Sequence, residues 1–186
     1  MEPSRTAPLP LNLWTTSLPP VDARLASWLA EPGLLTDRLR TLGAGELRLT
    51  VVRQCLDILA TEHRTLLGVA AENGFMREIE LQVGGEPCIY AQTLVPDATL
   101  ARFPWLAELG DSPLGETLGV LDGIQREPFE FAELPAVHPL AARAQRDIAN
   151  EARETLVARR ALVSLRGQPL LVQELFLPAL RRRLQA

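Results

Sequence analysis

The chain has 186 residues, of which 47% are hydrophobic and 23% charged, and its formal net charge is −4. These values predict one folded domain over residues 1–186 and give no electrostatic reason to expect a nucleic-acid partner. No apolar run reaches the roughly 18 residues of a membrane helix, and the N-terminus lacks the apolar region of a secretory signal. We therefore expect a cytoplasmic protein without stable membrane insertion, acting as a monomer or weak oligomer.

The residue types that the chain lacks exclude several kinds of chemistry. All 19 basic residues are arginines, because the sequence contains no lysine. A Schiff-base lysine, a pyridoxal phosphate anchor and a P-loop are thereby excluded, since each needs an amine. The two cysteines (Cys55 and Cys88) and the two histidines are separated in the sequence, so we predict neither a disulfide framework nor a metal site.

The N-terminal part of the chain predicts a helical hairpin. Residues 1–20 are rich in proline, and we expect them to be a mostly extended lead-in. Asp22 can cap a first helix, which the Pro32-Gly33 pair ends. A second helix is expected to follow from Leu35 and to stop at Gly43.

From Glu46 onward the apolar period changes to two, which predicts strands. The clearest one spans Phe75 to Val83, and the glycine pair Gly84-Gly85 turns it into a return strand ending at Val95-Pro96. Residues 58–72 show no regular pattern, and we expect an irregular connection there.

The second half of the chain combines helical and strand patterns. We expect a helical segment over residues 100–118, interrupted by two prolines, and an amphipathic helix from His138 to Leu156 in which Arg143 pairs with Asp147. Further strands are predicted at residues 124–134, 161–165 and 170–177. Strands in hairpin pairs together with clustered helices predict an α+β fold with an antiparallel sheet.

Arg77 is the first candidate for a site residue. It lies in the middle of the apolar face of a predicted strand, between Phe75 and Ile79. A guanidinium stays charged when buried, so it needs an anion. That anion is either a glutamate of the chain or a ligand carboxylate. Arg53 ends the apolar side of its own strand in a similar way, but a structural role is favoured for it.

Glu174 is the second candidate. It lies within the run Leu170 to Leu177, which is apolar on both faces. A carboxylate in such a strand needs a partner or a raised pKa. It either pairs with an arginine, Arg77 included, or acts as an acid, base or hydroxyl acceptor in a pocket. Tyr90 and Cys88 alternate on their strand and are expected to belong to the core rather than to act as nucleophiles.

With these residues in view, the sequence resembles the chorismate pyruvate-lyase family. The order and spacing of several segments carry this resemblance over most of the chain from Trp28 onward. They are Trp28 to Arg38, Val51-Val52-Arg53, Arg77-Glu78-Ile79 with the hairpin to Val95-Pro96, Ser112-Pro113-Leu114-Gly115, and Arg159-Arg160 through Gly167-Gln168-Pro169 to Leu177-Pro178. The proline-rich lead-in and the long segment 138–156 depart from the family pattern.

The resemblance implies helices packed against an antiparallel sheet, with two helix-turn-helix flaps over an internal ligand pocket. The flaps would be residues 21–44 and roughly 99–119. Arg77 matches the family's carboxylate-binding arginine, and Glu174 matches its glutamate that binds the ligand hydroxyl. Leu114 matches a flap residue whose backbone amide touches the carboxylate, and Leu35 stands where a family member has methionine.

The resemblance further implies a cofactor-free lyase that converts chorismate to 4-hydroxybenzoate and pyruvate, the first committed step toward ubiquinone. Arg77 and Glu174 would be the catalytic residues. The alternative is a non-catalytic module that binds an aromatic acid, because effector domains of some bacterial transcription regulators share this fold. Only about 45 residues precede the first strand, which is short for a DNA-binding domain plus a flap.

Overall fold

The structure is a computed structural model that describes residues 13–42, 46–149 and 152–185. Its strands are β1 (Leu47–Ile58), β2 (Asn73–Val83), β3 (Glu86–Pro96), β4 (Ile124–Arg126), β5 (Glu130–Leu134), β6 (Leu156–Leu165) and β7 (Gln168–Phe176). Its helices are α1 (Ala23–Leu29), α2 (Leu35–Leu42), α3 (Thr61–Leu67), α4 (Asp97–Arg102), the 3-10 turn η1 (Pro104–Ala107), α5 (Leu114–Gly119), α6 (Pro139–Ala144) and α7 (Pro178–Gln185).

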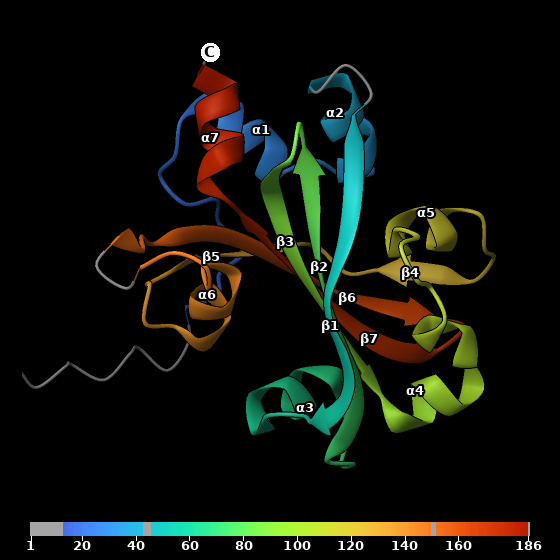
Figure 1. Ribbon diagram of the computed structural model, residues 1–186. Helices are drawn as coiled ribbons and strands as arrows, with labels where there is room; N and C mark the ends of the chain where they lie inside the picture. The colour runs from blue at the N-terminus through green and yellow to red at the C-terminus, as the bar shows by residue number, and fades with distance from the viewer. Residues whose placement is uncertain (1–12, 43–45, 150–151, 186) are drawn as a thin grey trace, which may run out of the picture.

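The strands form one twisted antiparallel sheet in the order β1-β2-β3-β7-β6-β4, with β5 also paired to β6 (Figure 1). The predicted hairpin turns at Gly84 and Gly85, whose φ angles of 56° and 78° lie in the left-handed region that glycine adopts without steric cost. The α+β prediction and the antiparallel sheet are thus confirmed.

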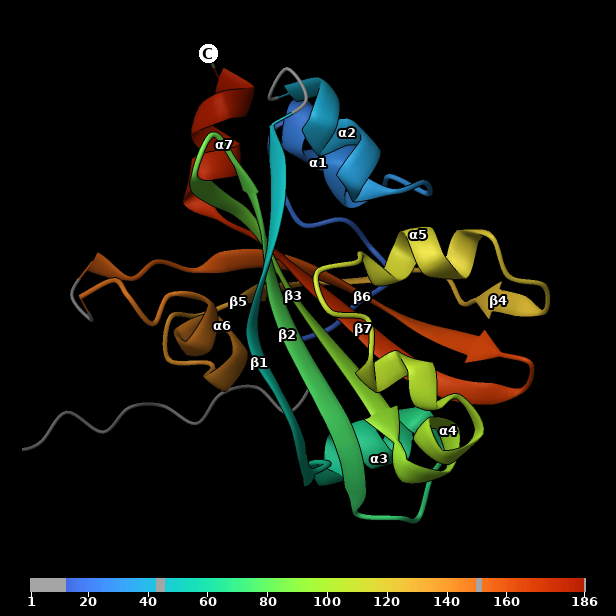
Figure 2. The same ribbon diagram turned by 45° about the vertical axis from the view of Figure 1, so that its right-hand side comes forward.

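Helices cover both faces of this sheet (Figure 2), with α5 and α6 on opposite sides. Nearly all of β2 is buried, so the face opposite Arg77 is not solvated. That second face carries Glu78 and Glu80, and two arginines from the α6 region neutralise them. Arg143 Nε lies 2.9 Å from Glu78 Oε1, and Arg146 Nη2 lies 2.8 Å from Glu80 Oε1. These ion pairs make the burial of two carboxylates tolerable.

The predicted helix from His138 to Leu156 is wrong in its extent. Helix α6 ends at Ala144, and Leu156 already begins β6. The Gln145 side chain bridges the connecting loop, because its amide donates to the Glu154 carbonyl and its Oε1 accepts from the Glu154 amide, both at 2.9 Å. Arg143 pairs with Glu78 rather than with Asp147, so the expected pair within the helix is also wrong.

The structure also differs from the sequence-based expectations at residues 58–72 and 124–134. The segment 58–72 is not irregular throughout, because it contains α3, which ends at Gly68 with a φ of 67°. Strand β1 also runs on to Ile58 and carries a bulge between Val51 and Arg53. The continuous strand expected over residues 124–134 is two separate strands, β4 and β5.

The two predicted helical hairpins are present. Asp22 Oδ1 accepts a hydrogen bond of 3.0 Å from the Leu25 amide and so caps α1, as predicted. The predicted stop at Gly43 lies outside the described residues. Helices α4 and α5 with η1 form the second hairpin, interrupted at Pro104 and Pro113 as expected. In the described part of the chain, no helix has the length and apolar character needed to cross a membrane.

We predict that His138 makes the stability of the fold depend on pH. Its Nδ1 accepts a hydrogen bond of 3.2 Å from the Leu140 amide and caps α6, and its burial lowers its pKa below the usual 6.5. As the pH falls from 7.5 to 5.5, the unfolded chain binds the proton first, so the free energy of unfolding should fall.

The matched variant His138→Asn keeps a capping acceptor that does not titrate in this range. Urea denaturation at several pH values should show a flatter pH dependence for this variant than for the natural protein. Burial also lowers the pKa of His63, so some slope should remain. Identical slopes in both proteins would rule out the His138 contribution.

Candidate functional site

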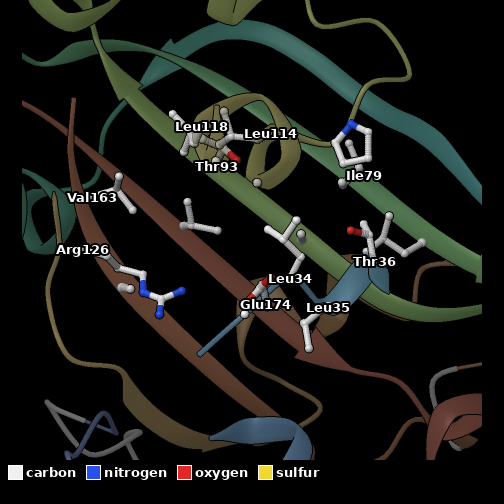
Figure 3. Close-up of a pocket in the computed structure, with 18 of the residues that line it drawn as sticks. Leu34, Leu35, Thr36, Ile79, Thr93, Leu114, Leu118, Arg126, Val163 and Glu174 are labelled. Carbon is white, nitrogen blue, oxygen red and sulfur yellow. The ribbon is translucent and has the colours of Figure 1, made fainter. Parts of the chain in front are cut away.

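A cavity of about 480 Å³ lies between one face of the sheet and the two helical hairpins. This size falls within the range of about 300–1,000 Å³ that is typical of small-molecule sites. All four residues predicted from the sequence line it: Arg77 on β2, Glu174 on β7, Leu35 at the start of α2 and Leu114 at the start of α5. Leu35, Leu114 and Glu174 are seen around the cavity in Figure 3.

Arg77 is 2% exposed and forms no ion pair with any residue in the described ranges. Its Nη2 donates to the carbonyl oxygens of Gly110 at 2.8 Å and Ser112 at 3.1 Å. Its Nε is buried and finds no acceptor among the described residues. Burial lowers the pKa of this guanidinium. The expected alternative of an internal salt bridge to a glutamate is therefore wrong, and the cavity keeps a positive charge without a counter-ion.

Glu174 has an arginine partner, but that partner is Arg159 of β6 rather than Arg77. Arg159 Nε lies 2.6 Å from Glu174 Oε2. Arg159 Nη1 also donates to three carbonyl oxygens at the end of α1, of which those of Leu29 (3.1 Å) and Glu31 (2.7 Å) are the nearer. Glu174 Oε1 accepts no hydrogen bond from the described part of the chain, so it is available to a ligand.

Arg159 is a site residue that the sequence interpretation missed. It is 2% exposed and lines the cavity from the middle of β6. Its place is equivalent to that of Arg77, because it lies between the apolar side chains of Val157 and Ala161 on one face of a strand. That signal was present in the sequence. The expected helix to Leu156 and a strand starting only at Ala161 left Arg159 between two elements.

Arg126 of β4 is a second arginine that the sequence interpretation did not single out. Its guanidinium projects into the cavity (Figure 3), and its Nη2 donates to the Pro32 carbonyl at 2.8 Å. The guanidinium carbons of Arg126 and Arg159 lie 4.4 and 4.1 Å from the ring centre of Phe129, which separates the two cations. Burial and the charge of Arg159 lower the pKa of Arg126.

The two helical hairpins touch each other beside the cavity. Arg40 Nη2 of α2 lies 2.6 Å from Glu116 Oε1 of α5. Next to this ion pair, a Cβ atom on Gly115 would lie only 3.0 Å from Leu34 Cδ2, so glycine permits the close approach. The two flaps that the resemblance implied are therefore present and in contact with each other.

Other candidate residues have structural roles. Arg53 lies at the surface and pairs with Asp57 at 3.1 Å, which confirms the structural interpretation. Tyr90 and Cys88 are fully buried in the core, as expected, and burial raises the pKa of both groups. Within the described ranges, no group of three or more histidine, cysteine or acidic side chains is placed to hold a metal ion.

We predict a large loss of stability for one of two matched variants of the ligand-free protein and a small change for the other. Arg159→Met should lower the free energy of unfolding by about 3 kcal/mol, because it leaves the Glu174 carboxylate without its partner. Arg77→Met should change it by less than about 1 kcal/mol, since it removes a buried charge that has no counter-ion. Urea denaturation measures both. An equally large loss for Arg77→Met would mean that its two carbonyl contacts hold the fold together.

Comparison with known sequences points to one family. The chorismate lyase family matches residues 12–185. A protein of Dechloromonas aromatica named "Probable chorismate pyruvate-lyase" is 36% identical over 164 residues, which are 86% of this chain and 89% of that one. A relative with the same name, numbered 1, from Pseudomonas fluorescens is 38% identical over 161 residues, which are 85% and 84% of the two chains.

Solved structures with the same fold include effector domains of bacterial regulators. The C-terminal domain of PhnF superposes with a TM-score of 0.56 at 18% identity, covering 77% of this chain and 87% of that one. The effector domain of PhnF from Mycobacterium smegmatis gives 0.54 at 16% identity, with 79% and 90% covered. At this identity the likeness concerns the fold alone.

Proposed function

This chain belongs to the chorismate lyase family, and we propose that it converts chorismate to 4-hydroxybenzoate and pyruvate, the first committed step toward ubiquinone. The observation that carries the proposal is the buried Arg77, which has no anionic partner among the described residues and lines a cavity whose other walls are mostly apolar. An aromatic carboxylate supplies the missing charge and fills the apolar space.

In this proposal Arg77 binds the ring carboxylate of chorismate. Two of its three nitrogen atoms, Nε and Nη1, have no partner among the described residues, because Nη2 alone is held by the carbonyls of Gly110 and Ser112. A guanidinium binds a carboxylate through two parallel hydrogen bonds, and this contact fixes the ring in one orientation. The backbone amides at Leu114 and Leu35 assist from the two flaps.

Glu174 then accepts the hydrogen bond of the hydroxyl group at the opposite end of the ring. Arg159 holds Oε2 of this carboxylate, which leaves Oε1 for the ligand. The reaction breaks the bond between ring C3 and the ether oxygen, and the C4 hydrogen passes to the enolpyruvyl methylene carbon. The ring becomes aromatic, and the released enolpyruvyl group becomes pyruvate. No external oxidant or reductant enters this balance, and we propose that the residues position and stabilise the reacting groups.

The experiment that tests the function gives purified, chelator-treated protein chorismate alone. We expect 4-hydroxybenzoate and pyruvate in equal amounts, measured by chromatography and a coupled pyruvate assay. Arg77→Met is the matched control, since it should keep its fold but lose product formation. Folded protein that binds 4-hydroxybenzoate yet leaves chorismate intact would favour the alternative, a non-catalytic module that binds an aromatic acid.

We further predict the effect of Glu174→Gln. The amide keeps an acceptor oxygen and the shape of the side chain, but it cannot take up and release a proton. If Glu174 assists the movement of the C4 hydrogen, kcat should fall about 10²–10⁴-fold. The Kd of 4-hydroxybenzoate, measured by calorimetry, should change far less. A kcat close to that of the natural protein would limit Glu174 to positioning and favour direct hydrogen transfer.

A further inference from the structure

The charges that line the cavity do not balance. Arg77, Arg126 and Arg159 contribute three positive charges, and Glu174 contributes one negative charge, so the lining carries a net charge of +2. The Arg159–Glu174 ion pair accounts for one charge of each sign. Arg77 and Arg126 remain, and neither forms an ion pair with a described residue. Arg77 is buried and Arg126 is exposed to solvent at the cavity, so the lining offers two cationic groups to a ligand with two negative charges.

Arg126 has donors to spare and faces the cavity. Its Nη2 is used by the Pro32 carbonyl, but Nε and Nη1 make no hydrogen bond with the described residues. Figure 3 shows the guanidinium directed toward Glu174. The two groups are close enough for the Glu174 charge to raise the pKa of Arg126, against the larger lowering by burial and by Arg159. Arg126 thus lies at the Glu174 end of the cavity.

The positions of the substituents on chorismate decide what meets Arg126. If Arg77 holds the ring carboxylate on C1 and Glu174 the hydroxyl on C4, the enolpyruvyl ether on C3 lies next to the hydroxyl. The second carboxylate of the substrate then lies at the Glu174 end of the cavity. Arg126 is the cation there that has no acidic partner among the described residues.

We propose that Arg126 binds the enolpyruvyl carboxylate and so distinguishes the dianionic substrate from the monoanionic aromatic product. This inference rests on the proposed function, because it takes the orientation of the ring from Arg77 and Glu174. The product 4-hydroxybenzoate lacks the enolpyruvyl carboxylate and therefore makes no such contact with Arg126. After the ether bond breaks, the carboxylate at Arg126 belongs to pyruvate, which no longer has a covalent link to the ring.

Two ligands that differ by one carboxylate test this role without turnover. The first is 3-(carboxymethoxy)-4-hydroxybenzoate, which carries a second carboxylate on an ether at ring position 3. The second is 3-methoxy-4-hydroxybenzoate, which keeps the ether and lacks that carboxylate. The natural protein should bind the dicarboxylate about 10- to 100-fold more tightly, as measured by calorimetry. Arg126→Met should abolish this preference while changing the Kd of the methoxy compound by less than about threefold.

Two further variants sharpen the test. Arg126→Lys should recover part of the preference, because an ammonium replaces the guanidinium with a single point charge. Arg53→Met removes the same charge from the surface pair with Asp57 and should leave both affinities unchanged. With chorismate as substrate, Arg126→Met should raise KM about 10-fold or more, whereas inhibition by 4-hydroxybenzoate should stay within about threefold of the natural protein.

Each other outcome overturns the inference in a recognisable way. Equal weakening of both ligands by Arg126→Met would mean that Arg126 acts by holding the Pro32 carbonyl and the first flap. An unchanged preference would mean that the second carboxylate binds elsewhere. If the natural protein bound neither aromatic ligand, the ring orientation on which the inference rests would be wrong, whereas failure to consume chorismate would refute the proposed function itself.

Discussion

The buried guanidinium of Arg159 connects the parts of the molecule that form the cavity. Through Nε it holds Glu174 of the neighbouring strand, and through Nη1 it holds the carbonyls at the end of α1. A helix end leaves its last carbonyl groups without partners, and burying them is costly unless a donor reaches them. Arg159 supplies that donor and at the same time has a carboxylate for its charge. One side chain thus fixes the orientation of Glu174 and the place of the first flap.

The same principle explains why both faces of the sheet can be covered. On the face away from the cavity, Glu78 and Glu80 are neutralised by arginines of the α6 region, so burial of these acids is tolerated. On the cavity face the charges are left partly uncompensated, at Arg77 and Arg126. The contrast concerns Arg77 above all, because a buried charge without a protein partner is costly to keep unless a ligand supplies its counter-ion, whereas Arg126 is exposed to solvent at the cavity.

Much of the fold and part of the site could be predicted from the sequence. Arg77 and Glu174 stood out because each places a charge in an otherwise apolar strand, and the glycine pair marked the hairpin. Arg159 satisfied the same rule but was missed, since its strand was assigned too short. The apolar stripe from His138 to Leu156 fits a helix, and only the tertiary contacts of Gln145 and the sheet end α6 at Ala144. Arg126 carried no local signal, because its place in the cavity depends on the pairing of a three-residue edge strand.

The anchoring of α1 by Arg159 has a mechanical consequence for access to the cavity. The three carbonyls that Arg159 holds end at Glu31, immediately before Pro32 and Gly33, so α1 is fastened to the sheet up to that point. Helix α2 beyond the Pro32-Gly33 pair is held to the second hairpin by the solvent-accessible ion pair between Arg40 and Glu116. The buried contacts of Arg159 and the exposed Arg40–Glu116 ion pair thus hold the two parts of the first flap in different ways. High ionic strength should therefore weaken the accessible Arg40–Glu116 ion pair between the flaps, since salt screens accessible charges, while the buried hydrogen bonds of Arg159 are little affected.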